Sequence, residues 1–217
     1  MYITMIIFDN QGVVVLQCQD RFVNNKLVGY VSRPQHKLCC SITALTGVFN
    51  YLYADIVGIK TSFELASILK IPIDDIGTTI DPSNSDIMDW FRTIVFELGL
   101  NGTCDFFLRD NDIDDLNYNL KSYTKIKETI KCKNNALIYH MDNHYTLIVG
   151  FFDSARDSKE VYQPNTSLDW YIKSLDWWII LGEHYCKFDP IWSILFRDLS
   201  KDIKDNDWHC ILRFSNE

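Results

Sequence analysis

Two adjacent cysteines, Cys39 and Cys40, open an apolar stretch that runs without a proline to Tyr53. Its apolar residues recur at helical spacing, at Ile42, Leu45, Phe49 and Leu52, which predicts a helix with both thiols at its N-terminus. Free N–H groups and the positive end of the helix dipole favour a thiolate at that position. The alternative is that both cysteines are small apolar residues packed beneath the helix, as free cysteines often are.

A second stretch, residues 134–152, is predicted to form a β-hairpin, because two apolar runs flank a short Met-Asp-Asn turn. The second run begins with His144. A cysteine that opens a helix and a histidine that opens a later strand are the nucleophile and base of a cysteine-hydrolase arrangement. The pair predicts a thiol hydrolase more strongly than either residue does alone.

This pattern resembles the papain-like cysteine peptidases. The segments Cys40-Ser-Ile-Thr-Ala-Leu-Thr-Gly-Val-Phe-Asn-Tyr-Leu and His144-Tyr-Thr-Leu-Ile-Val-Gly-Phe are most similar to the bacteriocin-processing type, the double-glycine-leader peptidases. In layout the resemblance covers residues 33–183, but in sequence only these two segments carry it. It implies an α+β, papain-like fold, in which an N-terminal helical half led by the cysteine helix packs on a C-terminal antiparallel β-sheet. The active cleft would lie between them.

The resemblance also implies roles for individual residues. Cys40 would attack a carbonyl carbon of a peptide or protein substrate, and His144 would take and return the proton. Gln35, five positions before Cys40, would stabilise the oxyanion through its amide, although it is equally a candidate for a solvated loop residue. Cys39 is the alternate nucleophile. Cys40 is favoured because, counted from it, Gln35 lies five positions upstream and Asn50 lies where the related peptidases carry a small or polar residue followed by aromatic ones.

A third group should orient the imidazole of the catalytic histidine. In the papain-like plan this acceptor comes from a strand after the histidine strand. Glu183, which follows an apolar run, is the first candidate, and Asp189 is the second. The Asn-Ser-Trp segment of papain itself is absent from this chain, so the assignment rests on position and not on a motif.

The Cys39-Cys40-Ser41 form of the helix start also resembles, more faintly, the basic immunoglobulin-like variable motif-containing proteins. That resemblance implies no function. Two further hypotheses remain beside the hydrolase. The chain could be a catalytically inactive papain-like fold that serves as a protein-interaction module. It could also bind zinc, since soft ligands occur at Cys39, Cys40, His140, His144, His184 and Cys186, although no Cys-x2-Cys pair supports them. We favour the absence of any cofactor or metal.

The composition narrows the choice of partners and of compartment. A net charge of -8 disfavours nucleic acid and anionic membranes as partners, since both require a surplus of Lys and Arg. No apolar run reaches the ~18 residues that a membrane span requires. Seven cysteines without a framework spacing, and no recognisable signal peptide, indicate reduced thiols and a cytoplasmic protein.

The chain is expected to form one domain. Residues 1–32 would add an N-terminal β-hairpin, and residues 33–217 would form the papain-like domain, with a long insertion at 153–176. Further helices are predicted to begin near Thr61 and Asn84 and to span 113–130 and 190–204. Strands are predicted at 103–108, 177–181 and 208–214.

Overall fold

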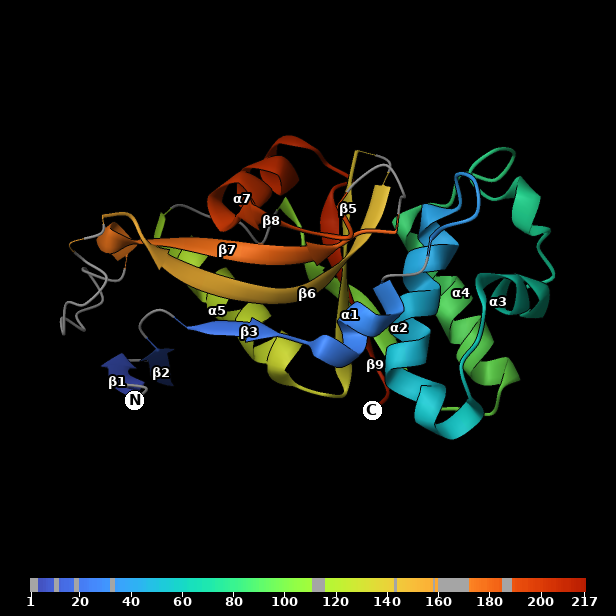
Figure 1. The fold of residues 1–217 in the computed structure, drawn as a ribbon, viewed down its shortest axis with the longest axis horizontal. Helices are drawn as coiled ribbons and strands as arrows, with labels where there is room; N and C mark the ends of the chain where they lie inside the picture. The colour runs from blue at the N-terminus through green and yellow to red at the C-terminus, as the bar shows by residue number, and fades with distance from the viewer. Residues whose placement is uncertain are drawn as a thin grey trace.

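An antiparallel sheet runs through the molecule and is covered by helices on both faces (Figure 1). The structure is a computed structural model, and it describes residues 4–9, 12–17, 20–31, 34–110, 116–142, 144–157, 159, 172–184 and 189–217. Seven strands form the sheet in the order β4-β9-β5-β6-β7-β8, and β3 pairs with β6 beside this path. The predicted α+β class with an antiparallel sheet is therefore confirmed.

The strands of this sheet come mostly from the C-terminal half of the chain. They are β3 (Arg21–Val23), β4 (Thr103–Leu108), β5 (Asn135–Met141), β6 (His144–Ala155), β7 (Leu175–Gly182), β8 (Ile191–Leu195) and β9 (Cys210–Ser215). The first half of β6 pairs with β5 and its second half with β3, while β7 pairs along the other edge. The predicted hairpin that carries the histidine is thus the centre of the sheet.

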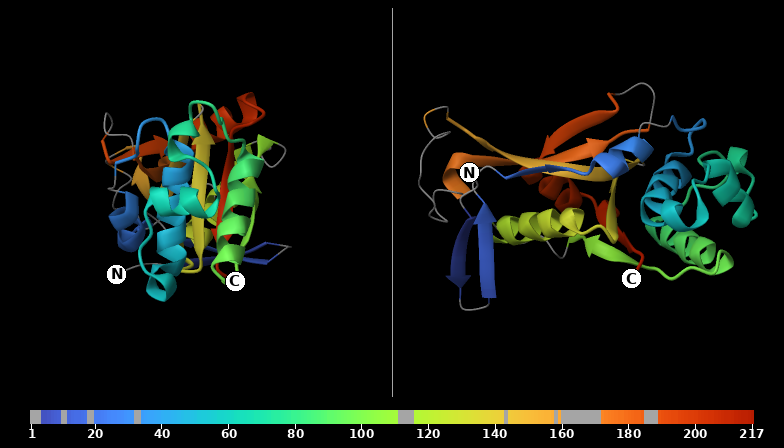
Figure 2. Two further views of the ribbon diagram at one scale, coloured as in Figure 1. Left: turned by 90° about the vertical axis from the view of Figure 1, so that its right-hand side faces the viewer. Right: turned by 60° about the horizontal axis from the view of Figure 1, so that its bottom comes forward.

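Both faces of the sheet are buried, and this explains why β5 and β6 are apolar without alternation. Ala136 and Ile138 belong to one core, which the sheet shares with α1 (Asn25–Val31), α2 (Cys40–Val57), α3 (Ser62–Ile68) and α4 (Asn84–Glu97). Leu137 and Tyr139 belong to a second core, with α5 (Leu116–Lys131) and α7 (Phe196–Asp205). Figure 2 shows α2, α3 and α4 gathered at one end of the molecule, while β6 and β7 extend away from it.

Helix α2 is the centre of the first core, since every residue from Cys40 to Tyr53 is buried. It is the one helix in the described part of the chain whose length and mean hydropathy would allow it to cross a membrane, and 78% of it is buried within the protein. Its one amide side chain, Asn50, exchanges two 2.8 Å hydrogen bonds with the backbone of Lys60. A long core helix of a folded domain has this burial pattern.

The two helices after α2 begin as the sequence predicts. The side chain of Thr61 caps α3 and that of Ser83 caps α4, and in each case an acidic residue three positions later bonds back to the cap. A one-turn helix, η1 (Ile73–Asp75), and a tight loop connect them. In that loop the backbone N–H groups of Thr78, Thr79 and Ile80 all donate to the carbonyl oxygen of Asp75.

The prediction of one helix over 190–204 is wrong in its first part. Residues 191–195 form β8, which pairs with β7, and α7 begins only at Phe196. Ile191, Trp192 and Ile194 favour a strand, and the helical spacing starts with Phe196, Leu199 and Ile203, which are all buried. The helical spacing therefore begins at Phe196 and does not include residues 191–195.

Residues 4–31 are only partly separate from the main sheet. Strands β1 (Thr4–Asp9) and β2 (Gly12–Gln17) form their own two-stranded sheet, as the hairpin prediction requires. However, β3 joins β6, and Leu27 and Val31 of α1 are buried in the first core. Strands β6 and β7 extend into the predicted insertion at 153–176, and residues 158 and 160–171 of that insertion lie outside the described part of the chain.

Candidate functional site

The structure separates the two cysteines at the start of α2. Cys39 precedes the helix and is fully buried; its Sγ donates to the carbonyl oxygen of His36 and lies 3.7 Å from Oγ1 of Thr43. Burial raises the pKa of the Cys39 thiol. Cys40 is the first residue of the helix and lines a cavity. Of the two candidate nucleophiles, Cys40 and not Cys39 lines the cavity, and 9% of Cys40 is exposed.

His144 and Glu183 form a close pair on the sheet side of this cavity. Nε2 of His144 lies 2.8 Å and 2.9 Å from the two carboxylate oxygens of Glu183. The strand register explains this contact, because Leu147 of β6 pairs with Gly182 of β7 and brings the end of β7 beside the start of β6. The Glu183 side chain is only 2% exposed, and its Oε1 also accepts from the backbone N–H of His184 at 2.8 Å.

The environment of His144 favours the imidazolium form. Burial acts to lower its pKa, but hydrogen bonds to Cys40 and Glu183, and the negative charges of both groups, outweigh burial and raise the pKa to about 9. Since Nε2 faces Glu183, Nδ1 is the ring nitrogen left for the Cys40 thiol. The chain thus brings a thiol, an imidazole and a carboxylate into one hydrogen-bonded series.

Gln35 and Asp189 also line the cavity. The Nε2 of Gln35 donates to the carbonyl oxygen of Lys37 at 2.7 Å, and its backbone N–H donates to the carbonyl oxygen of His184 at 3.0 Å. An amide nitrogen carries two hydrogens, so one donor of Gln35 remains after this contact. Asp189 is exposed, and the carboxylate in contact with His144 is that of Glu183.

The cavity itself has a volume of about 890 Å³ and two walls. The helical wall combines the start of α2 and the loop before α4, and the other wall combines the ends of β5, β6 and β7 with β8. The lining residues are Gln35, Leu38, Cys40, Ser41, Gly77, Thr78, Asp81, Pro82, Met141, Asp142, His144, Tyr145, Glu183, Asp189 and Trp192. A cavity of this size can hold a small molecule or a side chain with its flanking backbone.

Some of these lining residues were not found from the sequence. Trp192 was assigned to a helix, whereas in β8 it pairs with Leu181, two residues before Glu183. Its Ile-Trp-Ser-Ile context, which favours a strand, was the available signal. Asp81 lies in a loop and Asp142 in a turn, with no catalytic spacing, and only the folded chain brings them to the same cavity as Cys40.

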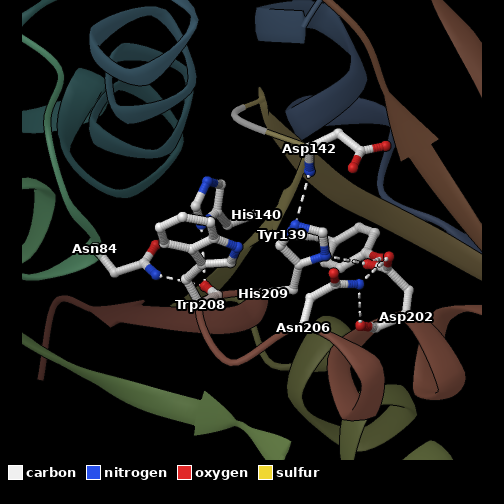
Figure 3. Close-up of polar contacts among 8 residues, drawn as sticks. All are labelled: Asn84, Tyr139, His140, Asp142, Asp202, Asn206, Trp208 and His209. Atoms are coloured by element: carbon white, nitrogen blue, oxygen red, sulfur yellow. Dashed lines mark hydrogen bonds and ion pairs between the residues drawn. The ribbon is translucent and has the colours of Figure 1, made fainter.

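His140, a candidate zinc ligand, instead contacts the backbone of Trp208 (Figure 3). Its Nδ1 lies 3.1 Å from the carbonyl oxygen of Trp208, and its ring stacks on Tyr145 with 4.2 Å between ring centroids. Burial lowers the pKa of His140 to about 4. Among the residues that the structure describes, no group of three or more His, Cys, Asp or Glu side chains is placed to hold a metal ion. Cys186, another of the candidate ligands, lies outside the described residues.

The fold and the site define the class: an α+β protein in which a thiol, an imidazole and a carboxylate meet at a cavity between helices and sheet. Residues 18–213 match the family described as "Basic immunoglobulin-like variable motif-containing protein". The chain belongs to this family. The fainter of the two resemblances in the sequence was therefore the correct one.

Three curated relatives carry the same family name. One from Giardia intestinalis is 31% identical over 57% of this chain and 46% of the relative. One from Xenopus laevis is 24% identical over 85% of this chain and 42% of the relative, and one from Mus musculus is 27% identical over 80% and 36%. The chain thus matches less than half the length of each of these relatives.

The family match overturns the functional prediction from the sequence. None of the matched proteins is named as a peptidase, a hydrolase or a zinc protein, and the match gives no support to the papain-like peptidase superfamily. The assignment as a cysteine peptidase or thiol protease is therefore withdrawn, together with the alternatives offered beside it. A cysteine on a helix and a histidine on a strand indicate a kind of thiol chemistry, but they do not specify the bond on which it acts.

Proposed function

We propose that Cys40, His144 and Glu183 form a nucleophilic cysteine centre for acyl transfer. The observation that supports this proposal most directly is the hydrogen-bonded series of the three side chains at the wall of an open cavity. A nucleophile next to a base that a third group orients is the usual signature of covalent catalysis. The proposal concerns the reaction centre and not the identity of the acyl donor.

In the first step, the Cys40 thiolate attacks an acyl carbonyl carbon and forms a tetrahedral oxyanion. The leaving group departs with the proton that His144 carries, and the acyl group remains on Cys40 as a thioester. In the second step, His144 takes the proton of an acceptor nucleophile, which attacks the thioester and releases Cys40. Glu183 holds the imidazole and stabilises its positive charge throughout.

The oxyanion requires donors close to Cys40. The first N–H groups of an α-helix have no partner within the helix, and Cys40 is the first residue of α2. Gln35 lines the same cavity and has a second amide hydrogen beyond its bond to Lys37. We assign the oxyanion site to these two sources of donors.

The finer fold assignment, papain-like, is part of the same proposal. What supports it is the position of the cysteine at the start of a buried helix that faces an antiparallel sheet, together with a histidine at the first residue of a sheet strand. It is a statement about the arrangement of elements and brings no peptidase activity with it.

The test is the rate of alkylation of each cysteine by iodoacetamide as a function of pH, with mass-spectrometric mapping. Cys40 should react selectively near pH ~6, where an ordinary thiol with a pKa near ~8.5 is protonated. Partly buried Cys132 and a small free thiol in solution are the reference thiols; Cys104 is unsuitable, because burial raises its pKa to about 11. Replacement of His144 by alanine should remove the selectivity.

Equal rates for Cys40 and the reference thiols, with no effect of His144→Ala, would contradict the proposal. Circular dichroism and thermal unfolding of the variant serve as controls for folding. A Cys40→Ser variant shows which labelled peptide carries the fast phase, because that phase must disappear.

A further inference from the structure

Three aspartates from separate parts of the chain converge on the cavity beside Cys40. Asp81 comes from the loop before α4, Asp142 from the turn between β5 and β6, and Asp189 from the segment before β8. All three residues are exposed. They lie on both walls, so any molecule bound in the cavity is flanked by carboxylates.

These carboxylates have no cationic partner among the described residues. Aspartates elsewhere on the surface do, since Asp55 pairs with Lys26 and Asp89 with Arg92. No lysine or arginine is among the described residues that line the cavity. Glu183 adds a fourth carboxylate, which faces His144, so the negative charges of the three aspartates are not balanced at the cavity wall.

The cavity wall also carries groups that suit a cation on an alkyl chain. The indole of Trp192, also on the wall, is a surface that attracts cations, while Leu38 and Met141 can contact an alkyl chain.

We propose that this cavity accepts acyl substrates that carry a cationic group, an ammonium or a guanidinium, and disfavours anionic ones. The inference rests on the proposed function, because Cys40 must be the reacting group in the same cavity. A cleft lined by one sign of charge concentrates ions of the opposite sign and increases their association rates by about 10-fold or more.

The experiment compares three methanethiosulfonate reagents that differ in charge: trimethylammonioethyl (cationic), methyl (neutral) and sulfonatoethyl (anionic). Each reacts in the same way, since the thiolate attacks the sulfenyl sulfur, forms a mixed disulfide and releases methanesulfinate. Rates at Cys40 are divided by the rates of the same reagents with a small free thiol. We expect this corrected cationic rate to exceed the anionic rate by about 10-fold at low salt, with the ratio falling as salt rises.

The matched variants separate the effect of the three cavity aspartates from the effect of the net charge of the protein. Asp81→Asn, Asp142→Asn and Asp189→Asn together should bring the cationic-to-anionic ratio close to 1. Asparagine suits position 142, where φ is 41° and few residues are tolerated. The control carries Asp55→Asn, Asp89→Asn and Asp205→Asn, which change the net charge equally on exposed residues away from the cavity. It should retain the wild-type ratio.

Two failures are distinguishable. If Cys40 reacts no faster than the reference thiols even with the neutral reagent, the proposed function is wrong and the substrate inference falls with it. If Cys40 reacts fast with the neutral reagent but shows no preference for the cationic one, only the substrate inference is wrong. The same holds if both triple variants lose the preference for the cationic reagent equally.

Discussion

At the scale of single residues, Glu183 is one of the two groups, with Cys40, that raise the pKa of His144. Its side chain is almost fully buried, and both of its oxygens face the ring of His144. A buried carboxylate without a positive partner is costly, so the pair stabilises the imidazolium and the carboxylate together. The sequence could suggest Glu183 only by its place after an apolar run, because the contact depends on the register of β6 and β7.

Replacement of Glu183 by glutamine tests this role with almost no change in volume. We expect the pKa of His144 to fall from about 9 by roughly one unit or more, because the opposite charge beside the ring is removed. The pH profile of Cys40 alkylation should shift accordingly. Asp189→Asn is the matched control, since Asp189 lines the same cavity without the contact to His144. An equal effect of both changes would show that the pKa of His144 depends on the summed negative charge of the cavity and not on the contact with Glu183.

At the scale of elements, the turn between β5 and β6 fixes the position of His144. The backbone N–H of Asp142 donates to Nε2 of His209 at 3.0 Å, and Nδ1 of that ring lies 2.8 Å from Asp202 of α7. Tyr139 also donates to the Asp202 carboxylate (Figure 3). Because His209 accepts at Nε2, its Nδ1 carries the proton that faces Asp202. The network ties the turn to the end of α7.

We therefore expect His209→Ala to destabilise the protein by about 1–3 kcal/mol, since it leaves the N–H of Asp142 and the Asp202 carboxylate without this partner. Urea unfolding measures the loss of stability. Compared with the wild type, amide hydrogen exchange in the variant should become faster at Asp142 and change less at core strand positions such as Ile138. Unchanged exchange at Asp142 would mean that the turn is held by other contacts.

Elements were predictable where the local signal and the fold agree. The caps of α3 and α4 and the apolar runs of β5 and β6 are visible in the sequence. Strand β8 was missed because its short apolar run is followed directly by the helical spacing of α7. The role of His209 could not be predicted, since its two partners, Asp142 and Asp202, come from different elements and no spacing relates them.

At the scale of the whole molecule, a buried ionic network joins the start of β3 to α5 and β6. Nζ of Lys127 lies 3.2 Å from both Asp20 and Asp153. Lys131 also bonds Asp20 at 2.8 Å, and the hydroxyl of Tyr123 donates to Asp153 at 2.6 Å. Because these residues are far apart in sequence, the network helps to hold the N-terminal segment on the sheet.

Replacement of Lys127 by methionine keeps most of the side-chain volume but removes the shared cation. We expect a loss of about 3 kcal/mol in the free energy of unfolding, because two buried carboxylates lose a partner. Lys121→Met, on the exposed side of the same helix, should change stability by less than about 0.5 kcal/mol. Similar effects of both changes would indicate that the network contributes little.

The family assignment also belongs to the whole-molecule scale. The sequence alone favoured the papain-like peptidases, on the evidence of a cysteine and a histidine at given positions. Many unrelated proteins share so few residues. The family match extends over residues 18–213 and so includes both the helices and the sheet that form the core. Short motifs led to the wrong family, whereas a match over most of the chain identified the family.

The central claim is that Cys40 and His144 form a thiolate–imidazolium pair. Its most direct test is an NMR titration of the His144 ring in the wild-type chain and in Cys40→Ala. We expect His144 to titrate near 9 in the wild type and clearly lower in the variant, because the negative sulfur that stabilises the imidazolium is gone. If His144 titrates at the same pH in both proteins, no thiolate lies beside it and the account of the site is wrong.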